Sequence, residues 1–521
     1  MRFRMKELLC SALVILSTNH SFGQRSVLTW NYNNARWGAN TQETILTPSN
    51  VNTTHFGKLF SQPVDGPVVG QALYLPNVTI PNKGVHNVVY VATMNDTVYA
   101  FDADHNTGTS SVPLWTKRVL PAGATPVPIT VQGGGGVTGW KQVGVISTPV
   151  VDPSTGIIYV VAKDYSNSVV SNRLWGLSVT TGAASFNPVL IAATFSSGGK
   201  TYKFDDRTQI NRPALLLSFG FIYIAFGSNG VNGVEQGWVI AYSASTSASP
   251  TPQFRGAFDD EPGKYTAAIW QKGAGPSADS GGNVYVETGD GPVIPGTNFG
   301  ESVLELRRVS GSTLALRDWF TPYNWQYLYS HDFDLNDSVL ILPNQPGLYP
   351  YLAIAVGKEG TLYMLNRANM GHFCSMCASS DTQIVQELPH AVGSETGSLI
   401  YWNGKVYSSG EGSPIMAWSI SNGLLSPTPI AKSVAVAGGH SPVLSANGTA
   451  NGILWQLQGS SPTTNYALQA FDAITLARIY SASQNPGRDS LPGFPHFAQL
   501  IEVNGKVYVG TNSTLEVFGL L

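Results

Sequence analysis

The sequence predicts an all-β fold, and within that class an eight-bladed β-propeller of four-stranded antiparallel blades. Three observations support this prediction. The composition is rich in Gly (55 residues) and Pro (32), while only 12% of residues are charged, which suits many short strands joined by tight turns. A strand-turn-strand pattern is present, and that pattern recurs along the chain. The length of 521 residues is compatible with a single closed ring.

The clearest copy of the pattern is VVYVATMNDTVYAFDAD at residues 88–104. Apolar and polar residues alternate on both sides of Asn95-Asp96, beginning with Val89 and Val91. Period-2 alternation is typical of a half-buried strand, and a short turn rich in Asn and Asp joins two such strands antiparallel. We therefore expect a β-hairpin in this segment.

Seven further segments repeat the pattern, beginning at residues 157, 221, 283, 351, 405, 452 and 506. The unit averages roughly 62 residues, which is enough for four strands and their loops. Radial stacking buries the faces of such sheets against their neighbours and keeps the exposed edges short. We expect SVLTWNYNN at 26–34 to pair with the last blade and seal the ring. Two stacked sandwiches or a parallel β-helix are the alternative architectures.

The N-terminal segment has the features of an export signal. Three basic side chains within the first six residues precede an apolar run, Leu8–Leu16, and a small-x-small triplet at 21–23. We expect residues 1–23 to be a signal peptide cut near Gln24, and residues 24–521 to form the propeller outside the cytoplasm, either periplasmic or secreted. A buried N-terminal helix is the alternative interpretation.

The overall charge and hydropathy exclude two classes of partner. The formal net charge of −3 provides no basic field, so we do not expect nucleic acid to bind. After the signal segment, no run approaches the roughly 18 to 20 apolar residues of a membrane helix. We therefore expect no membrane span in the mature chain.

Two cysteines lie in GHFCSMCAS, at Cys374 and Cys377. In an exported protein this spacing most simply indicates a local disulfide. A redox-active motif is disfavoured because no βαβ pattern surrounds it, and covalent haem because Ala378 stands where a His is required. Two cysteines alone also make a poor zinc site.

Several longer stretches resemble the pyrroloquinoline-quinone (PQQ) propeller proteins. They include WNYNN with TPSNV near the N-terminus, VVYVATMNDTVYAFDADHNTG, STPVVDPSTGIIYVVAK, NRPALLL, SHDFD and GKEGTLYMLNR. The resemblance extends over nearly the whole mature chain. Quinoprotein alcohol dehydrogenases, the best-known enzymes of this family, hold PQQ and Ca²⁺ on the axis of eight blades. The resemblance therefore implies a PQQ and calcium site and the oxidation of an alcohol or a sugar.

The segment YNWQYLYSHDFDLND looks like the one that carries the catalytic aspartate of the family, which by motif position is Asp332. A carboxylate beside a divalent cation stays ionised and can act as a general base. If the segment is extended, Asp334 and Asn336 lie on the same side and offer further oxygen ligands for a metal. A solvated turn before the next strand is the alternative interpretation.

The resemblance also implies three other site residues. Lys358 falls where the family places a cation that touches the quinone and the catalytic carboxylate, although a lysine in a Gly-flanked turn is otherwise simply exposed. Asp290 falls where the dehydrogenases use an Asn to ligate calcium, and a carboxylate suits a hard cation. Glu235 lies three residues later than the calcium-binding Glu of the family.

Two departures from the family concern the quinone. Ser277 stands at the position of the stacking Trp, and Trp270 is too far upstream to be its direct equivalent. No cysteine lies between residues 24 and 373, so the pair of adjacent cysteines that forms the second stacking surface is missing. These losses remove much of the apolar sandwich that holds a flat cofactor.

The sequence thus supports two functions. The first is a PQQ- and calcium-dependent dehydrogenase of alcohols or sugars, with Asp332 as base. The second is a non-catalytic propeller that binds a protein or a glycan, since a fold alone does not determine function.

Overall fold

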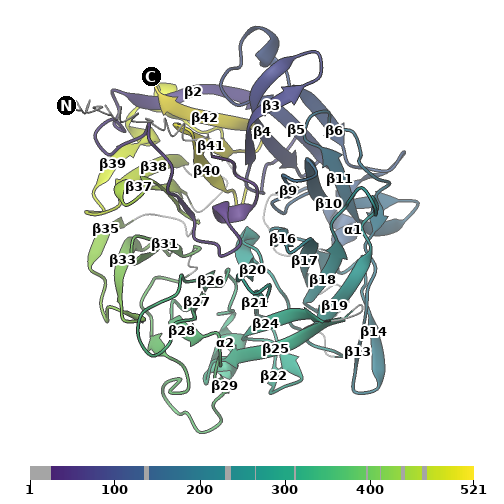
Figure 1. Cartoon of the computed structure of the whole chain (residues 1–521), viewed down its shortest axis with the longest axis vertical. Helices are drawn as coiled ribbons and strands as arrows, with labels where there is room; N and C mark the ends of the chain where they lie inside the picture. The colour runs from purple at the N-terminus through teal and green to yellow at the C-terminus, as the bar shows by residue number, and fades with distance from the viewer. Residues whose placement is uncertain are drawn as a thin grey trace, which may run out of the picture.

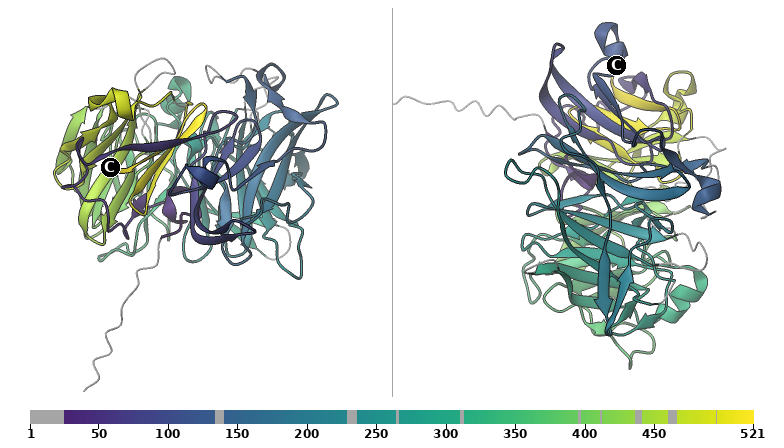
Figure 2. Two further views of the ribbon diagram at one scale, coloured as in Figure 1. Left: turned by 90° about the horizontal axis from the view of Figure 1, so that it is seen from above. Right: turned by 90° about the vertical axis from the view of Figure 1, so that its right-hand side faces the viewer.

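The computed structural model describes residues 25–133, 140–228, 236–263, 266–309, 313–394, 397–410, 412–435, 441–459, 466–493 and 495–521. In this part of the chain, eight sheets of four to six strands are arranged around a common axis (Figure 1), and two further pairs of short strands lie outside them. The predicted eight-bladed propeller is confirmed. Figure 2 shows loops on both faces of the ring.

Each blade has an innermost strand near the axis and three further strands outward, joined antiparallel. The first four blades are β3 (Leu73–Ile80), β4 (Gly84–Thr93), β5 (Thr97–Asp102), β6 (Trp115–Arg118); β9 (Val150–Asp152), β10 (Ile157–Ser166), β11 (Val169–Ser178), β12 (Val189–Leu190); β16 (Leu216–Ser218), β17 (Phe221–Ser228), β18 (Trp238–Ser243), β19 (Phe254–Asp259); and β20 (Ser277–Ala278), β21 (Val284–Thr288), β24 (Ser302–Val309), β25 (Thr313–Thr321).

The last four blades are β26 (Leu340–Ile341), β27 (Leu352–Val356), β28 (Leu362–Asn366), β30 (Gln386–Leu388); β31 (Ile400–Trp402), β32 (Lys405–Ser408), β33 (Pro414–Ser421), β35 (Ala431–Ala435); β36 (Val443–Asn447), β37 (Ala450–Gln458), β38 (Ala467–Asp472), β39 (Arg478–Ser481); and β40 (Leu500–Val503), β41 (Lys506–Gly510), β42 (Thr514–Leu520), β2 (Phe56–Pro63).

The remaining described strands and the α-helices are short. They are β1 (Ala39–Asn40), β7 (Thr125–Pro128), β8 (Gln142–Val143), β13 (Thr194–Ser197), β14 (Lys200–Lys203), β15 (Gln209–Ile210), β22 (Val293–Ile294), β23 (Asn298–Phe299), β29 (His372–Phe373), β34 (Leu424–Leu425) and the α-helices α1 (Ile129–Gln132), α2 (Trp325–His331) and α3 (Pro486–Asp489). Within the described ranges, no helix has the length and apolar character needed to cross a membrane.

The repeated sequence pattern corresponds to the second and third strands of every blade. In the first copy, β4 pairs antiparallel with β5 from Val88↔Asp102 to Thr93↔Thr97, so the predicted hairpin at 88–104 is confirmed. The other seven copies form the equivalent hairpins of the other seven blades. Alternate side chains of these strands fill the apolar layers between neighbouring blades, as the cluster shared by the first two blades illustrates.

The ring is closed by β2, which pairs antiparallel with β42 from Phe56↔Leu520 to Pro63↔Thr514. The expectation that residues 26–34 add a strand to the last blade is therefore wrong. The physical reason is that β2 can complete the outer edge of that blade, whereas residues 26–34 are drawn to the axis by their own buried side chains.

The segment between Val27 and Asn40 runs around the axis, inside the ring. It contacts the innermost strand of each blade in chain order. The contacts are Val27 with Tyr74 in β3, Leu28 with Val151 in β9, Asn34 with Leu217 in β16, Asn34 with Ala278 in β20, Ala35 with Ile341 in β26, Trp37 with Tyr401 in β31, Gly38 with Leu444 in β36 and Asn40 with Glu502 in β40. We call these residues the axial segment. Figure 1 shows it in purple near the centre of the ring.

Two side chains fix the axial segment at the centre. Trp30 is fully buried against Ala214 and Ala274, and its indole N–H donates to Oε1 of Gln499 at 3.4 Å. Arg36 is 1% exposed. Its guanidinium donates to four oxygen atoms: the carbonyl oxygens of Pro276, Leu215 and Trp30 and the hydroxyl of Thr29. Arg36 thus joins the axial segment to the third and fourth blades.

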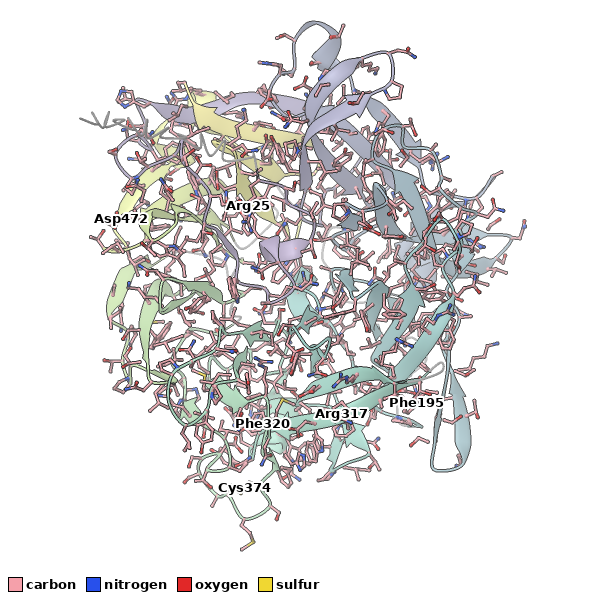
Figure 3. The ribbon with its side chains drawn as sticks, in the orientation of Figure 1. Arg25, Phe195, Arg317, Phe320, Cys374 and Asp472 are labelled. Carbon is pink, nitrogen blue, oxygen red and sulfur yellow. A yellow bond between two sulfur atoms is a disulfide. The ribbon has the colours of Figure 1, made fainter. Side chains whose placement is uncertain are left out.

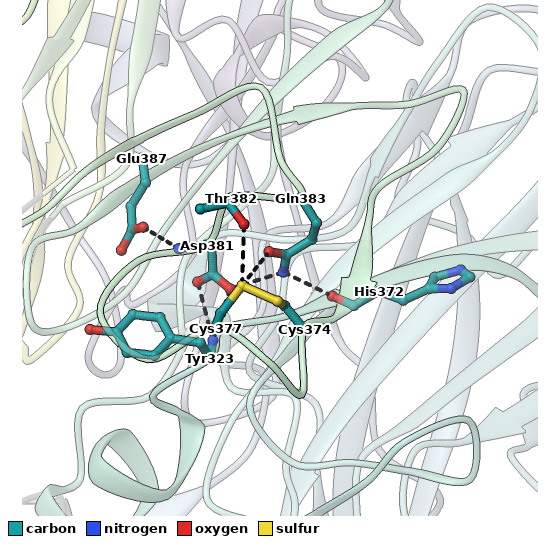
Figure 4. Close-up of a disulfide and its surroundings, with 8 residues drawn as sticks. All are labelled: Tyr323, His372, Cys374, Cys377, Asp381, Thr382, Gln383 and Glu387. Carbon is teal, nitrogen blue, oxygen red and sulfur yellow. Dashed lines mark hydrogen bonds between the residues drawn. A yellow bond between two sulfur atoms is a disulfide. The ribbon is translucent and has the colours of Figure 1, made fainter.

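The cysteines form the predicted disulfide, with an S–S distance of 2.00 Å between Cys374 and Cys377. Figure 3 places Cys374 at the periphery of the ring, and Figure 4 shows its surroundings. Gln383 lies beside the disulfide and donates to the carbonyl of His372 and to the carboxylate of Asp381. The loop is therefore held by hydrogen bonds as well as by the disulfide.

We predict that Arg36→Met lowers the free energy of unfolding by about 3 kcal/mol, because it leaves several buried acceptors without a donor. Urea unfolding of the protein measures this change. The matched control is Arg317→Met, at an exposed position on β25 labelled in Figure 3, which should change stability by less than about 0.5 kcal/mol. Equal effects of the two substitutions would show that Arg36 does not anchor the axial segment.

We predict that replacing both Cys374 and Cys377 by Ser costs only about 1 to 2 kcal/mol, because so short a loop restricts the unfolded chain little. The same urea experiment, run without reductant, measures the difference. A loss larger than about 4 kcal/mol would contradict the view that this loop is peripheral.

Candidate functional site

The candidate site lies at one end of the ring, in loops of the fourth and fifth blades. Because successive strands of a blade alternate in direction, the loop that enters an innermost strand and the loop between the second and third strands lie at the same end. Asp290 follows β21, Asp332 and Asp334 precede β26, and Lys358 follows β27. Loops far apart in the sequence thus meet at one place.

The structure brings the predicted residues Asp290, Asp332 and Lys358 together, with Asp334 among them. Nζ of Lys358 lies 2.7 Å from Oδ1 of Asp332 and 2.5 Å from Oδ2 of Asp334. One carboxylate oxygen each of Asp290, Asp332 and Asp334 lies within 4.8 Å of the other two. We call these three residues the aspartate cluster.

The side chains of the aspartate cluster differ in their exposure to solvent. The side chain of Asp332 is 78% exposed, whereas that of Asp334 is 2% exposed and that of Lys358 11%. Burial alone would lower the pKa of Lys358, but Asp334 and Asp332 outweigh it and raise that pKa. Lys358 is therefore charged at neutral pH, and it compensates part of the negative charge of the cluster.

The backbone around the cluster is unusual. Asp290 and Asp332 have φ of 64° and 58°, in the left-handed region that few residues other than Gly adopt. Asp332 ends α2, and its N–H donates to the carbonyls of the last turn. A Cβ on Gly289 would lie 2.4 Å from the Cβ of Asp334, so only Gly permits this close approach. Such conformations persist where the surrounding structure holds them, often at functional sites.

Two buried glutamates lie beneath the cluster and join its loops. Glu301 accepts hydrogen bonds from the N–H groups of Asp290 and Leu335. Burial, followed by the charges of Asp334 and Asp290, raises the pKa of Glu301 well above its ordinary value. Glu287 accepts from the N–H groups of Asp337 and Val356, and burial, reinforced by Asp337, raises its pKa to about 8. Burial thus favours the protonated form of both glutamates, each of which joins two backbone N–H groups beneath the cluster.

Trp270 borders the cluster. Its indole N–H donates to Oδ2 of Asp290 at 2.8 Å. The guanidinium carbon of Arg212 lies 4.5 Å from the centroid of Trp270 and 4.4 Å from that of Phe497, so Arg212 contacts both rings. Phe497 has φ of 69°, which is a strained conformation for a bulky residue.

The sequence does not mark Trp270, Arg212 and Phe497 as a group. They come from the fourth, third and eighth blades, and no local spacing links them. The one signal available is their common position, since each lies a few residues before an innermost strand. Residues at such a position can also be structural ones that fill the space inside the ring, so the position alone does not identify a functional residue.

Three other residues that the sequence predicts for the site lie away from the aspartate cluster or outside the described residues. Ser277 is fully buried in β20, where it pairs with Tyr285, and its hydroxyl has no hydrogen-bond partner among the described residues. Glu235 lies outside the described residues. Asn336 is buried, and its Oδ1 lies 3.5 Å from Nη2 of Arg212. Helix α2 ends at His331, so Asp332 and Asp334, which converge, lie beyond it, whereas the side chain of Asn336 contacts Arg212.

The residues present fit a hard cation, because three carboxylates offer clustered oxygen ligands and Lys358 compensates only part of their charge. They do not fit a quinone stacked beside Trp270. Arg212 already packs on the rings of Trp270 and Phe497, and the sequence has no adjacent pair of cysteines. Stacking of a planar cofactor would require Arg212 to leave these rings.

We predict that stability falls as pH rises between about pH 5 and 8, in part because of Glu287. An acid whose pKa is raised by folding stabilises the protein below its unfolded pKa, and this contribution is lost as pH rises through the folded pKa of about 8. Each group of this kind contributes at most about 1.4 kcal/mol per pH unit. Glu287→Gln should be less stable overall but should show a shallower dependence on pH. Urea unfolding in EDTA from pH 5 to 8 tests this, and parallel curves for both proteins would refute it.

No protein-family model matches the sequence, and no curated protein matches it. The fold is similar to that of the quinohemoprotein alcohol dehydrogenase ADHIIG from Pseudomonas putida HK5, with a TM-score of 0.55 and 12% sequence identity over 95% of this chain and 80% of that chain. It is also similar to a europium-containing methanol dehydrogenase, with a TM-score of 0.61 and 12% identity over 95% of this chain and 98% of that chain. At this level of identity the comparisons show a propeller fold like that of the PQQ dehydrogenases.

Proposed function

We propose that this protein binds a hard cation at the aspartate cluster and, through it, a small molecule that bears hydroxyl groups. The observation that carries the proposal is the convergence of three carboxylates within 4.8 Å at one end of the ring. Carboxylates gathered so closely repel one another, and Ca²⁺ or a trivalent lanthanide ion prefers oxygen ligands of this kind. The similar methanol dehydrogenase contains europium, which makes a lanthanide a reasonable ion to test.

The residues of the cluster have different parts in this function. Asp290 and Asp334 are the less exposed ligands, and Trp270 and Glu301 hold Asp290 through its side chain and its backbone N–H. Asp332 is exposed, so its carboxylate can accept a hydrogen bond, or a proton, from a hydroxyl group of the ligand. A bound cation would supply Lewis-acid polarisation of that hydroxyl oxygen.

A second candidate function is the PQQ-dependent oxidation of an alcohol or a sugar. The observation that favours it is the direct contact between Lys358 and Asp332, the two residues that the resemblance implies for the quinone contact and the base. The guanidinium of Arg212 on Trp270 and Phe497 opposes it, because the rings are already covered. The first function needs no such rearrangement.

We also propose that residues 1–23 direct export and that the mature chain is periplasmic or secreted. The disulfide between Cys374 and Cys377 supports this, because such bonds persist mainly in oxidising compartments. N-terminal sequencing of protein isolated from the outer compartments of the host tests it. An uncleaved chain recovered from the cytoplasm would contradict it.

Titration of metal-free protein with Tb³⁺ tests the cation site, because the indole of Trp270 beside Asp290 can sensitise terbium luminescence. We expect saturable luminescence in the wild type and an affinity at least about tenfold lower in Asp334→Asn, equivalent to about 1.4 kcal/mol. Trp270→Phe should lose most of the luminescence yet still bind the ion, as competition calorimetry would show. Asp472→Asn, in the seventh blade and labelled in Figure 3, is the matched control and should behave as the wild type.

Absence of saturable binding in the wild type, or equal affinity in Asp334→Asn, would refute the cation site. Reconstitution with PQQ together with Ca²⁺ or Eu³⁺ then separates the two functions. Quinone absorbance retained by the protein, with dye reduction that depends on an alcohol or a sugar, would establish the dehydrogenase. Cation binding without quinone uptake would support the first function.

A further inference from the structure

Beside the aspartate cluster, helix α2 and the residues after it expose a patch of three aromatic rings. Tyr327 and His331 are four residues apart, so they lie on the same face of the helix, and their ring centroids are 4.2 Å apart. Phe333 continues the patch, with its centroid 6.0 Å from that of His331 and 5.9 Å from that of Tyr327. We call Tyr327, His331 and Phe333 the aromatic patch.

The patch is fixed in place yet open to solvent. Tyr327 is 47% exposed, His331 is exposed and Phe333 is half-buried. Nδ1 of His331 lies 2.9 Å from the carbonyl oxygen of Tyr327, which orients the imidazole, and Leu328 anchors the helix in the interior. Rigid aromatic side chains that keep exposed surface are typical of positions that receive a ligand.

The patch adjoins the aspartate cluster directly. Asp332 stands between His331 and Phe333 in the chain, and consecutive Cα atoms are about 3.8 Å apart. Its carboxylate contacts Lys358, so Asp332 joins the aromatic patch to the proposed cation ligands along the chain. The surface therefore combines an apolar, flat part with an oxygen-rich, charged part.

We propose that the ligand of this site is a pyranose sugar, stacked on the aromatic patch with two neighbouring hydroxyl groups directed to the aspartate cluster. A pyranose ring has a face of C–H groups, which packs on aromatic rings, and an edge of hydroxyl groups, which suits carboxylates and hard cations. A simple alcohol would use only the aspartate cluster and would leave the patch uncovered. This inference rests on the cation-binding function proposed above and names its ligand class.

Titration calorimetry with methyl β-D-glucopyranoside, methyl β-D-galactopyranoside and 1-butanol, each with saturating Ca²⁺, tests the inference. We expect at least one sugar to bind and 1-butanol to bind at least tenfold more weakly. Tyr327→Ala should weaken the sugar about tenfold while leaving the affinity for Tb³⁺ unchanged. The matched control is Tyr329→Ala, on the same helix and 40% exposed, which should leave both affinities as in the wild type.

The outcomes separate this inference from the proposal on which it rests. Equal sugar affinity in Tyr327→Ala and the wild type, or 1-butanol binding as tightly as the sugars, would overturn the inference even if Tb³⁺ binds normally. Sugar binding that persists in EDTA and still requires Tyr327 would keep the aromatic patch as a sugar site and remove the cation. Binding of neither Tb³⁺ nor any sugar would refute both proposals.

Discussion

The closure of the ring by β2 on β42 is the constraint on which the rest of the structure depends. A propeller blade buries its faces only when a neighbour stands on each side, so an open ring would expose the apolar faces of its first and last blades. Pairing from Phe56↔Leu520 to Pro63↔Thr514 completes the last blade with a strand from the other end of the chain and removes that gap. With the ring closed, the eight innermost strands surround a space that the axial segment can fill.

The axial segment links this closure to the site. Trp30 packs on Ala274, which follows Trp270 in the same loop, and its indole donates to Gln499. Gln499 in turn donates to the carbonyl of Phe497, so one buried residue at the axis supports both rings that hold Arg212. The glutamates beneath the aspartate cluster perform a similar task for the fourth and fifth blades. The site is thus precise because its loops share buried partners, although the loops themselves are short and irregular.

The sequence predicted those parts of the molecule that depend on local pattern. Alternation around Asn95-Asp96 identified the hairpin of one blade, and its recurrence gave the number of blades. The strand β2, FGKLFSQP, was not recognised, because it alternates poorly and its role is decided by β42 at the other end of the chain. Helix α2 was not predicted, because a helix of 7 residues is too short to show a clear helical period in the sequence.

The residues of the site, too, could be predicted only where a local motif marked them. Asp290, Asp332 and Lys358 were named through the resemblance of short motifs, and the geometry brings them into contact. Trp270 lies too far upstream to match the stacking position of the family, yet its indole N–H reaches Asp290 in the folded structure. Arg212 lies in the motif NRPALLL, but no motif pointed to its contact with Phe497, since that contact depends on the closed ring.

The axial segment also has a consequence for the order of folding. Its residues leave the ribosome before any blade, yet the phenol of Tyr32 bonds the backbone of Glu502, which lies 470 positions later in the chain. Contacts of such long sequence separation form late and slow folding, because loop entropy is lost before the contact is gained. The bond between Tyr32 and Glu502 can therefore form only after the eighth blade has been synthesised, although the axial segment that carries Tyr32 is synthesised before all eight blades.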